Sequence, residues 1–92
     1  MMYATKIKML HGCAKSNSIQ HIRKIYIEGC EEPRFYRRAE IHDYLVENPN
    51  SIRVNIEPNY PYLLPVTVNG VKFVRSEAND TPHDNLLSLP KV

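Results

Sequence analysis

The sequence predicts an α+β fold: a mainly antiparallel sheet of about five strands with one helix, in the order β-β-α-β-β-β, followed by a structured C-terminal tail. Three observations predict it. Five segments alternate with the period of a strand, residues 38–48 have the spacing of an amphipathic helix, and the strand connections are short. Ninety-two residues are expected to form a single domain, 1–92, with one core.

The first expected strand, 3–10, has one apolar and one basic face. The residues expected to share its buried face are Tyr3, Thr5, Ile7 and Met9. Lys6 and Lys8 then point to solvent. The second expected strand, 19–28, has apolar residues on both sides, namely Ile25 and Ile27 on one side and Ile22 and Tyr26 on the other. We therefore expect it to be central and partly covered on both faces.

The expected helix, 38–48, has one apolar face. The residues expected on that face are Ile41, Tyr44 and Leu45, and those expected to point away are His42, Asp43 and Glu47. Pro49 ends the helix, because the residue before a proline avoids the α region. Glu40 stands where the carboxylate of a capping box belongs, but Arg37 replaces the usual hydroxyl residue. We expect this to cost about 1 kcal/mol of helix stability.

Three further strands are expected after the helix. The segment 51–57 alternates, with Ile52, Val54 and Ile56 predicted to point inward. Asn69 and Gly70 predict a two-residue type I′ turn between 66–68 and 71–73. In that register one face of the hairpin carries four apolar residues, Val66, Val68, Val71 and Phe73, and the other carries Thr67 and Lys72. Between these strands Tyr60 and Tyr62 flank a proline in an aromatic loop.

The C-terminal tail combines polar residues suited to a turn with three leucines. Leu86, Leu87 and Leu89 are each worth about 1.5–3 kcal/mol if buried, so we expect the tail to fold back on the core. Asp84 and Asn85 are expected to bind backbone groups and fix the turn, because their short side chains reach nearby amides.

Composition and charge limit the classes of protein that the chain can represent. Apolar residues make up 42% and charged residues 24%, as in soluble proteins, and no apolar run is long enough to span a membrane. The first ten residues lack a secretory cleavage pattern, so we expect a cytoplasmic protein. Residues 1–40 carry eight Lys and Arg against four Glu, a balance of +4, whereas residues 41–92 carry four against six acidic residues, a balance of −2.

The end of the chain resembles a known family. The residues that carry the resemblance are 72–76, Asp80 and the run 84–90, in which the signature positions are Arg75, Asp84, Asn85, Leu86, Leu87, Leu89 and Pro90. They are similar to the closing signature of domain of unknown function 3892, found in small bacterial and phage-associated proteins. Arg38 to Tyr44 resembles the family's helix start. Ser76 and Arg37 depart from the usual threonine and hydroxyl cap. The resemblance implies an architecture but no catalytic residues.

Neither a metal site nor an active site is expected. The candidate ligands and nucleophiles are His11, Cys13, His21 and Cys30. They lack the short ligand spacings of zinc sites, and no third group is evident to orient a cysteine–histidine pair. Cys13 and Cys30 are expected at opposite ends of a hairpin, beyond disulfide distance, and so to be free thiols. We therefore expect no cofactor, no metal and no enzymatic activity.

Two binding functions remain open. The leading hypothesis is a module that binds a partner protein or forms a homo-oligomer, because Tyr60, Tyr62 and the leucine tail offer apolar contact area. The alternative is a protein that binds nucleic acid or a small anionic nucleotide through a basic strand face. Its residues would be Lys6, Lys8, Arg23 and Lys24, with tyrosines nearby.

Overall fold

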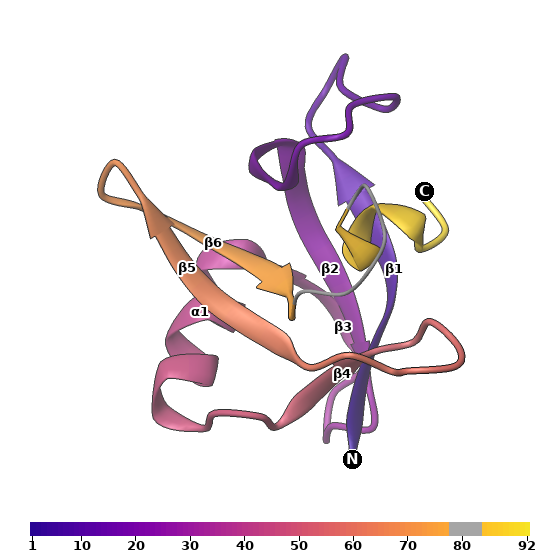
Figure 1. The fold of residues 1–92 in the computed structure, drawn as a ribbon, viewed down its shortest axis with the longest axis vertical. Helices are drawn as coiled ribbons and strands as arrows, with labels where there is room; N and C mark the ends of the chain where they lie inside the picture. Colours follow the sequence, from indigo (N-terminus) through magenta and orange to yellow (C-terminus); the bar gives the residue numbers. More distant parts are fainter. Residues whose placement is uncertain (78–83) are drawn as a thin grey trace.

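A computed structural model of the protein describes residues 1–77 and 84–92, so Asp80 lies outside the described residues. The described elements, in chain order, are β1 (Met2–Met9), η1 (Ile19–His21), β2 (Ile22–Glu28), β3 (Arg34–Arg37), α1 (Arg38–Glu47), β4 (Ile52–Val54), β5 (Leu63–Val68), β6 (Val71–Ser76) and η2 (Asn85–Ser88). The α+β class with one α-helix is confirmed. The strands form two sheets rather than one: a four-stranded sheet in the order β3-β2-β1-β4, and the hairpin β5-β6 (Figure 1).

The first strand departs from strict alternation. β1 pairs with β2 in antiparallel orientation, but Ala4 opposes Ile27 while Lys6 opposes Tyr26, which leaves Thr5 as an extra residue in β1. Such a bulge reverses the faces on either side of it. Ala4 is therefore buried with Ile7, and the prediction that Tyr3 and Thr5 share the buried face is wrong. β4 pairs with β1 in parallel orientation.

The second strand is central in its sheet and partly covered on the face away from the core, as predicted, but the prediction that Ile22 shares a face with Tyr26 is wrong. A register shift between Lys8 and Met9 brings Ile22 opposite Met9, so that Ile22 is buried together with Ile25 and Ile27. Tyr26 stays half-buried on the other face. One face of this strand therefore holds the core residues, and the opposite face is available for other contacts.

β3 is a strand that the sequence analysis did not predict. It pairs with β2 in antiparallel orientation and places Phe35 opposite Tyr26 and Arg37 opposite Lys24. It is only four residues long and lies between a turn and the helix that follows at once, so its alternation is brief and easily overlooked.

The helix α1 agrees with the predicted bounds to within one residue. Ile41 and Leu45 are buried as expected, whereas Tyr44 is 43% exposed. His42 was expected to face solvent but is buried, because the hairpin β5-β6 packs on this side of the helix. At the N-terminus, the Glu40 carboxylate accepts a hydrogen bond from the Arg37 backbone N–H at 3.1 Å. The Arg37 side chain has only hydrogen-bond donors, so it cannot accept the hydrogen bond from a helix amide that a complete capping box contains.

The hairpin β5-β6 has the predicted turn and register. Asn69 and Gly70 adopt φ values of 50° and 78°, and Val68 opposes Val71 while Val66 opposes Phe73. β5 also contains Pro65, which a strand tolerates at a sheet edge because no partner requires its missing N–H.

The strand predicted over 51–57 is shorter in the structure, since β4 ends at Val54. Ile56 nevertheless packs against the core.

The C-terminal segment completes the core, as predicted. Leu86, Leu87 and Leu89 are 0%, 8% and 3% exposed. The segment is also held to the edge of β1: Ile7 N–H donates to the Pro90 carbonyl at 2.9 Å, and Val92 N–H donates to the Ile7 carbonyl at 3.1 Å. Figure 1 shows η2 on one side of β1 and β2. In the part of the chain that the structure describes, no helix has the length and apolarity needed to cross a bilayer.

Candidate functional site: the outer face of the four-stranded sheet

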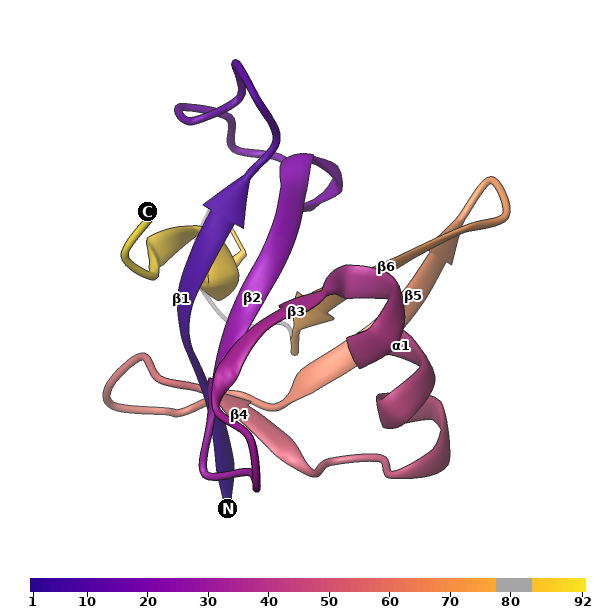
Figure 2. The ribbon, with the colours of Figure 1, turned by 180° about the vertical axis from the view of Figure 1, so that it is seen from behind.

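The side of β1, β2 and β3 that points away from the core carries basic and aromatic side chains. We call it the outer face, and define it by Lys6, Lys8, Lys24, Tyr26, Phe35 and Arg37. Register places them in two rows across the strands, one of Lys8, Lys24 and Arg37, the other of Lys6, Tyr26 and Phe35. Figure 2 shows this side of β1 and β2 without a helix over it.

The second row is an aromatic platform with lysines above it. The rings of Tyr26 and Phe35 meet edge to face, with centroids 5.1 Å apart. The Lys6 ammonium lies 4.8 Å from the centroid of Tyr26, and the Lys8 ammonium lies 5.2 Å from that of Phe35. These cation–π contacts are worth about 0.5–1 kcal/mol at exposed sites, so a ligand can displace either lysine at little cost.

The first row places three cations on adjacent strands, an arrangement that destabilises a sheet. Within the described residues, Lys8 and Lys24 form no ion pair. Arg37 contacts Glu40 at 3.4 Å. The backbone N–H of Arg37 lowers the pKa of Glu40, so this carboxylate is ionised at neutral pH. The row therefore keeps a net positive charge, because the Glu40 carboxylate can offset at most one of its three cations.

The other predicted binding residues are divided between this face and a separate cluster. Arg23 is exposed beside Lys24, at the register shift in β2. Tyr60 and Tyr62 are instead gathered around Arg53 in β4: its guanidinium donates to the Tyr60 carbonyl at 2.9 Å and to the Tyr62 hydroxyl at 2.8 Å. Both tyrosines thus support the chain's own loop.

Tyr60 is held further by two contacts. Its ring meets that of Tyr3 edge to face at 6.2 Å, and its hydroxyl donates to Glu57 at 3.1 Å. The hydrogen bond to this carboxylate raises the pKa of Tyr60. The Tyr60 phenol therefore stays neutral at physiological pH and adds no charge with which the cluster could bind a ligand.

Sequence reasoning placed Lys6, Lys8 and Lys24 together but missed the partners that make them a site. Phe35 and Arg37 belong to β3, which was not predicted, and Tyr26 was expected to share a face with Ile22, which the structure instead buries in the core. A signal was present: in the four residues after Pro33, Phe35 and Arg37 fall on one side and Tyr36 on the other, the alternation of a short strand.

The candidate ligands for a metal do not converge in the structure. Among residues 1–77 and 84–92, no group of three or more His, Cys, Asp or Glu residues could hold a metal ion. Cys13 and Cys30 are free thiols, as expected. His21 Nδ1 lies 2.6 Å from the Ser16 hydroxyl, which ties down the loop that precedes η1.

A family model described as "Protein of unknown function (DUF3892)" matches residues 3–90. The chain belongs to this family. No curated protein and no solved structure matches the chain. The match to DUF3892 confirms the resemblance inferred from the closing signature, whose residues have structural roles here.

Asp84 accepts hydrogen bonds from the Ser76 N–H and hydroxyl and from the Leu86 N–H, at 3.0, 2.9 and 3.0 Å.

The remaining DUF3892 signature residues join β6 to the tail. Arg75 Nε donates to the Ser76 carbonyl at 3.1 Å and lies 3.9 Å from the Asp84 carboxylate. The backbone N–H of Asn85 donates to the Ser76 hydroxyl at 3.2 Å. Ser76, which stands where the family usually has threonine, thus supplies the hydroxyl that this connection needs.

Proposed function

We propose that the protein is a non-enzymatic binder of single-stranded nucleic acid, with the outer face as its binding surface. The observation that supports it most is the row of Lys8, Lys24 and Arg37, which is unfavourable in the isolated molecule and becomes favourable against phosphates. Next to that row, Tyr26 and Phe35 offer rings on an open sheet, as in modules that stack unpaired bases.

Binding would require only small side-chain movements. A base that stacks on Tyr26 or Phe35 takes the place of the Lys6 or Lys8 ammonium, which lies about 5 Å from each ring. The displaced ammonium then reaches a phosphate on the same strand of nucleic acid. Stacking is worth about 1–3 kcal/mol per base, more than the cation–π contact that it replaces.

The salt dependence of binding tests this proposal. We expect a fluorescently labelled mixed-sequence 12-mer of DNA or RNA to bind at 50 mM salt. Log K should fall against log salt with a slope of about −2 to −3, as expected for three or four phosphate contacts on a single strand. Anisotropy titrations measure both quantities. No binding of either oligonucleotide at 50 mM salt would contradict the proposal.

Matched variants identify the surface. Lys8→Gln should reduce the steepness of the salt slope by about 0.7, whereas Lys15→Gln, in the loop after β1, should leave it unchanged. Phe35→Leu keeps an apolar side chain but loses the ring, so it should weaken binding about 5- to 100-fold at constant slope. Equal effects of Lys8→Gln and Lys15→Gln would mean that nucleic acid does not bind at the outer face.

The hypothesis of protein interaction or self-association retains one candidate surface. The tail leucines that motivated it lie in the protein's own core, and the tyrosines hold Arg53. On the hairpin, however, one face carries apolar residues that are only partly covered: Leu64, Val66, Val68 and Val71. A mass above that of the monomer by light scattering, reduced by Val71→Lys, would support this second function.

A further inference from the structure

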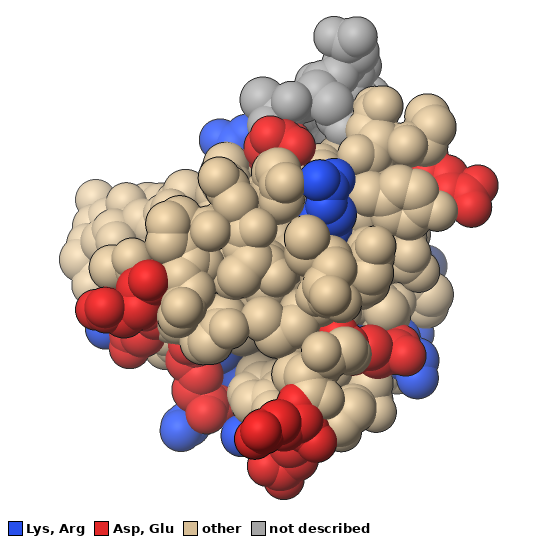
Figure 3. Space-filling view, turned by 90° about the horizontal axis from the view of Figure 1, so that it is seen from below, with Lys and Arg blue, Asp and Glu red and all other residues tan. Residues whose placement is uncertain are grey.

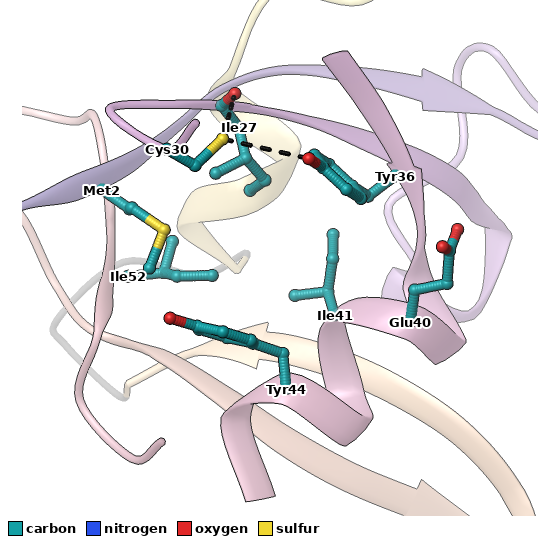
Figure 4. Close-up of a pocket in the computed structure, with 8 residues that line it drawn as sticks. All are labelled: Met2, Ile27, Cys30, Tyr36, Glu40, Ile41, Tyr44 and Ile52. Atoms are coloured by element: carbon teal, nitrogen blue, oxygen red, sulfur yellow. Dashed lines mark hydrogen bonds between the residues drawn. The ribbon is translucent and has the colours of Figure 1, made fainter. Parts of the chain in front are cut away.

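The end of the core between β2, β3, α1 and β4 contains a pocket that is separate from the outer face. Its volume is about 260 Å³. Three aliphatic side chains of the core, Ile27, Ile41 and Ile52, form part of its wall, and each is at most 3% exposed. Figure 4 shows the rings of Tyr36 and Tyr44 on opposite sides of this space. The pocket can therefore surround an apolar group on several sides.

The pocket is lined by Met2 and Ile52, which belong to the end of the molecule that carries the N-terminus and β4. Figure 1 shows that end at the bottom of the view. Seen from that end, a broad area without charged side chains occupies the centre of the surface (Figure 3). Acidic side chains border this area (Figure 3). Glu31 and Glu32 line the depression that adjoins the pocket, and Glu32 lies 3.9 Å from the Arg34 guanidinium, so an anion would meet negative charge on this side.

The charges around the pocket disfavour an ionised ligand. No Lys or Arg lines it, while Glu40 does. An anion would therefore meet a carboxylate without a compensating cation. Glu40 is already 3.4 Å from Arg37 and 3.8 Å from Arg34, so a cationic ligand would compete with two guanidinium groups. A neutral molecule avoids both costs.

Neutral polar groups are available to orient such a molecule. The Tyr36 hydroxyl donates to the Glu32 carbonyl at 2.7 Å and lies 4.0 Å from the Cys30 thiol. Partial burial and this thiol raise the pKa of Tyr36, so the phenol remains protonated. Within the described residues the Tyr44 hydroxyl forms no hydrogen bond, which leaves it able to pair with a ligand.

From this geometry we propose that the pocket binds a small neutral molecule that has one apolar ring and a single hydroxyl or carbonyl group. An apolar cavity of about 150 Å³ holds benzene, so the larger volume here suits a ring with a short side chain. The volume lies just below the usual range of ligand pockets, which favours a small ligand. The ring would pack against the isoleucines and tyrosines, and the polar group would meet Tyr44 or Cys30.

Three probes of matched size test the proposal: benzyl alcohol, benzoate and benzylammonium. Benzyl alcohol should shift the NMR methyl signals of Met2, Ile41 and Ile52 in a saturable manner, with a dissociation constant on the order of 1 mM. The two charged probes should bind at least about fivefold more weakly. Absence of saturable shifts with benzyl alcohol, or equal binding of benzoate, would overturn the proposal.

Variants confirm the location. Cys30→Phe fills the pocket and should reduce the affinity for benzyl alcohol about tenfold, whereas Cys13→Phe, in the distant loop after β1, should not change it. Because Cys30→Phe could also prevent folding, Tyr44→Ala provides a second variant at a partly exposed wall, and it should weaken binding about threefold. Unchanged affinity in Tyr44→Ala would overturn the assignment. Neither result depends on nucleic-acid binding at the outer face.

Discussion

At the scale of single residues, the Asp84 side chain connects the start of the tail to the end of β6. Its carboxylate is 12% exposed and accepts from two backbone amides and one hydroxyl, and two of these donors belong to the buried Ser76. Removal of such an acceptor leaves buried donors without a partner, which costs more than the net value of the bonds themselves.

We expect Asp84→Ala to lower the free energy of unfolding by about 2–4 kcal/mol. Asp84→Asn should cost much less, because one amide oxygen can take the position of Oδ1, where all three donors point. Urea denaturation followed by circular dichroism measures both. Asp43→Ala is the matched control: among residues 1–77 and 84–92 this exposed carboxylate pairs only with Lys72 and His42, so its loss should cost less than about 1 kcal/mol. Similar losses in Asp84→Ala and Asp43→Ala would contradict the prediction.

Glu40 gives stability a defined pH dependence. The Arg37 backbone N–H, with help from its side chain, holds the pKa of this carboxyl below the ordinary value of 4.5. Because the pKa is lowered on folding, the ionised group contributes stability that is complete above about pH 4.5 and is lost as the pH falls through the folded pKa. In Glu40→Gln the urea midpoint should therefore be lower than in the parent protein at pH 6, and this difference should shrink at pH 3.

The control for that experiment is Glu47→Gln on the same helix. Within the described residues Glu47 forms no ion pair, so its replacement should shift the midpoint little at either pH. A difference between Glu40→Gln and the parent protein that is constant from pH 6 to pH 3 would show that the Glu40 charge does not stabilise the helix start.

At the scale of elements, η2 contributes to the fold mainly by covering the core with its buried side chains. Leu86 is fully buried, and Ser88, two residues later, is exposed. We expect Leu86→Ala to cost about 2–5 kcal/mol, the usual result of opening a cavity in a core, and Ser88→Ala to cost less than about 0.5 kcal/mol. Thermal melts of both variants check this. A melting temperature for Leu86→Ala equal to that of Ser88→Ala would mean that the tail does not help to hold the core.

Elements with strong local signals were predicted well. The Asn69–Gly70 turn fixes the hairpin register, and helical spacing located α1 to within one residue. Errors arose where tertiary pairing decides the outcome. The bulge at Thr5 and the shift after Lys8 depend on how β1 and β2 align, and neither leaves a pattern in one strand alone. His42 is buried because a hairpin more than twenty residues later packs against it.

The same reason limited prediction of the candidate site. The lysines of β1 were visible as an exposed face because their alternation is local. Their aromatic partner Phe35 comes from a strand of four residues whose pairing with β2 the sequence did not reveal. The pocket was beyond sequence reasoning altogether, since its wall combines residues from β1, β2, β3, α1 and β4.

At the scale of the whole molecule, the charge asymmetry of the sequence becomes a division between two surfaces. The excess of basic residues in 1–40 gathers on the outer face, through Lys6, Lys8 and Lys24. The pocket end carries no basic residue in its lining. Under the two proposals made above, a polyanion would bind on one side of the molecule and a neutral molecule in a pocket on another.

The pairing of β1 has a consequence for synthesis on the ribosome. This strand precedes all of its partners in the chain, which are β2, then β4 at 52–54, and finally the segment at 90–92. Its edge at Ile7 remains open until that last segment has left the exit tunnel. The nascent chain therefore displays an unsatisfied strand edge from the time β1 emerges until residues 90–92 pair with it.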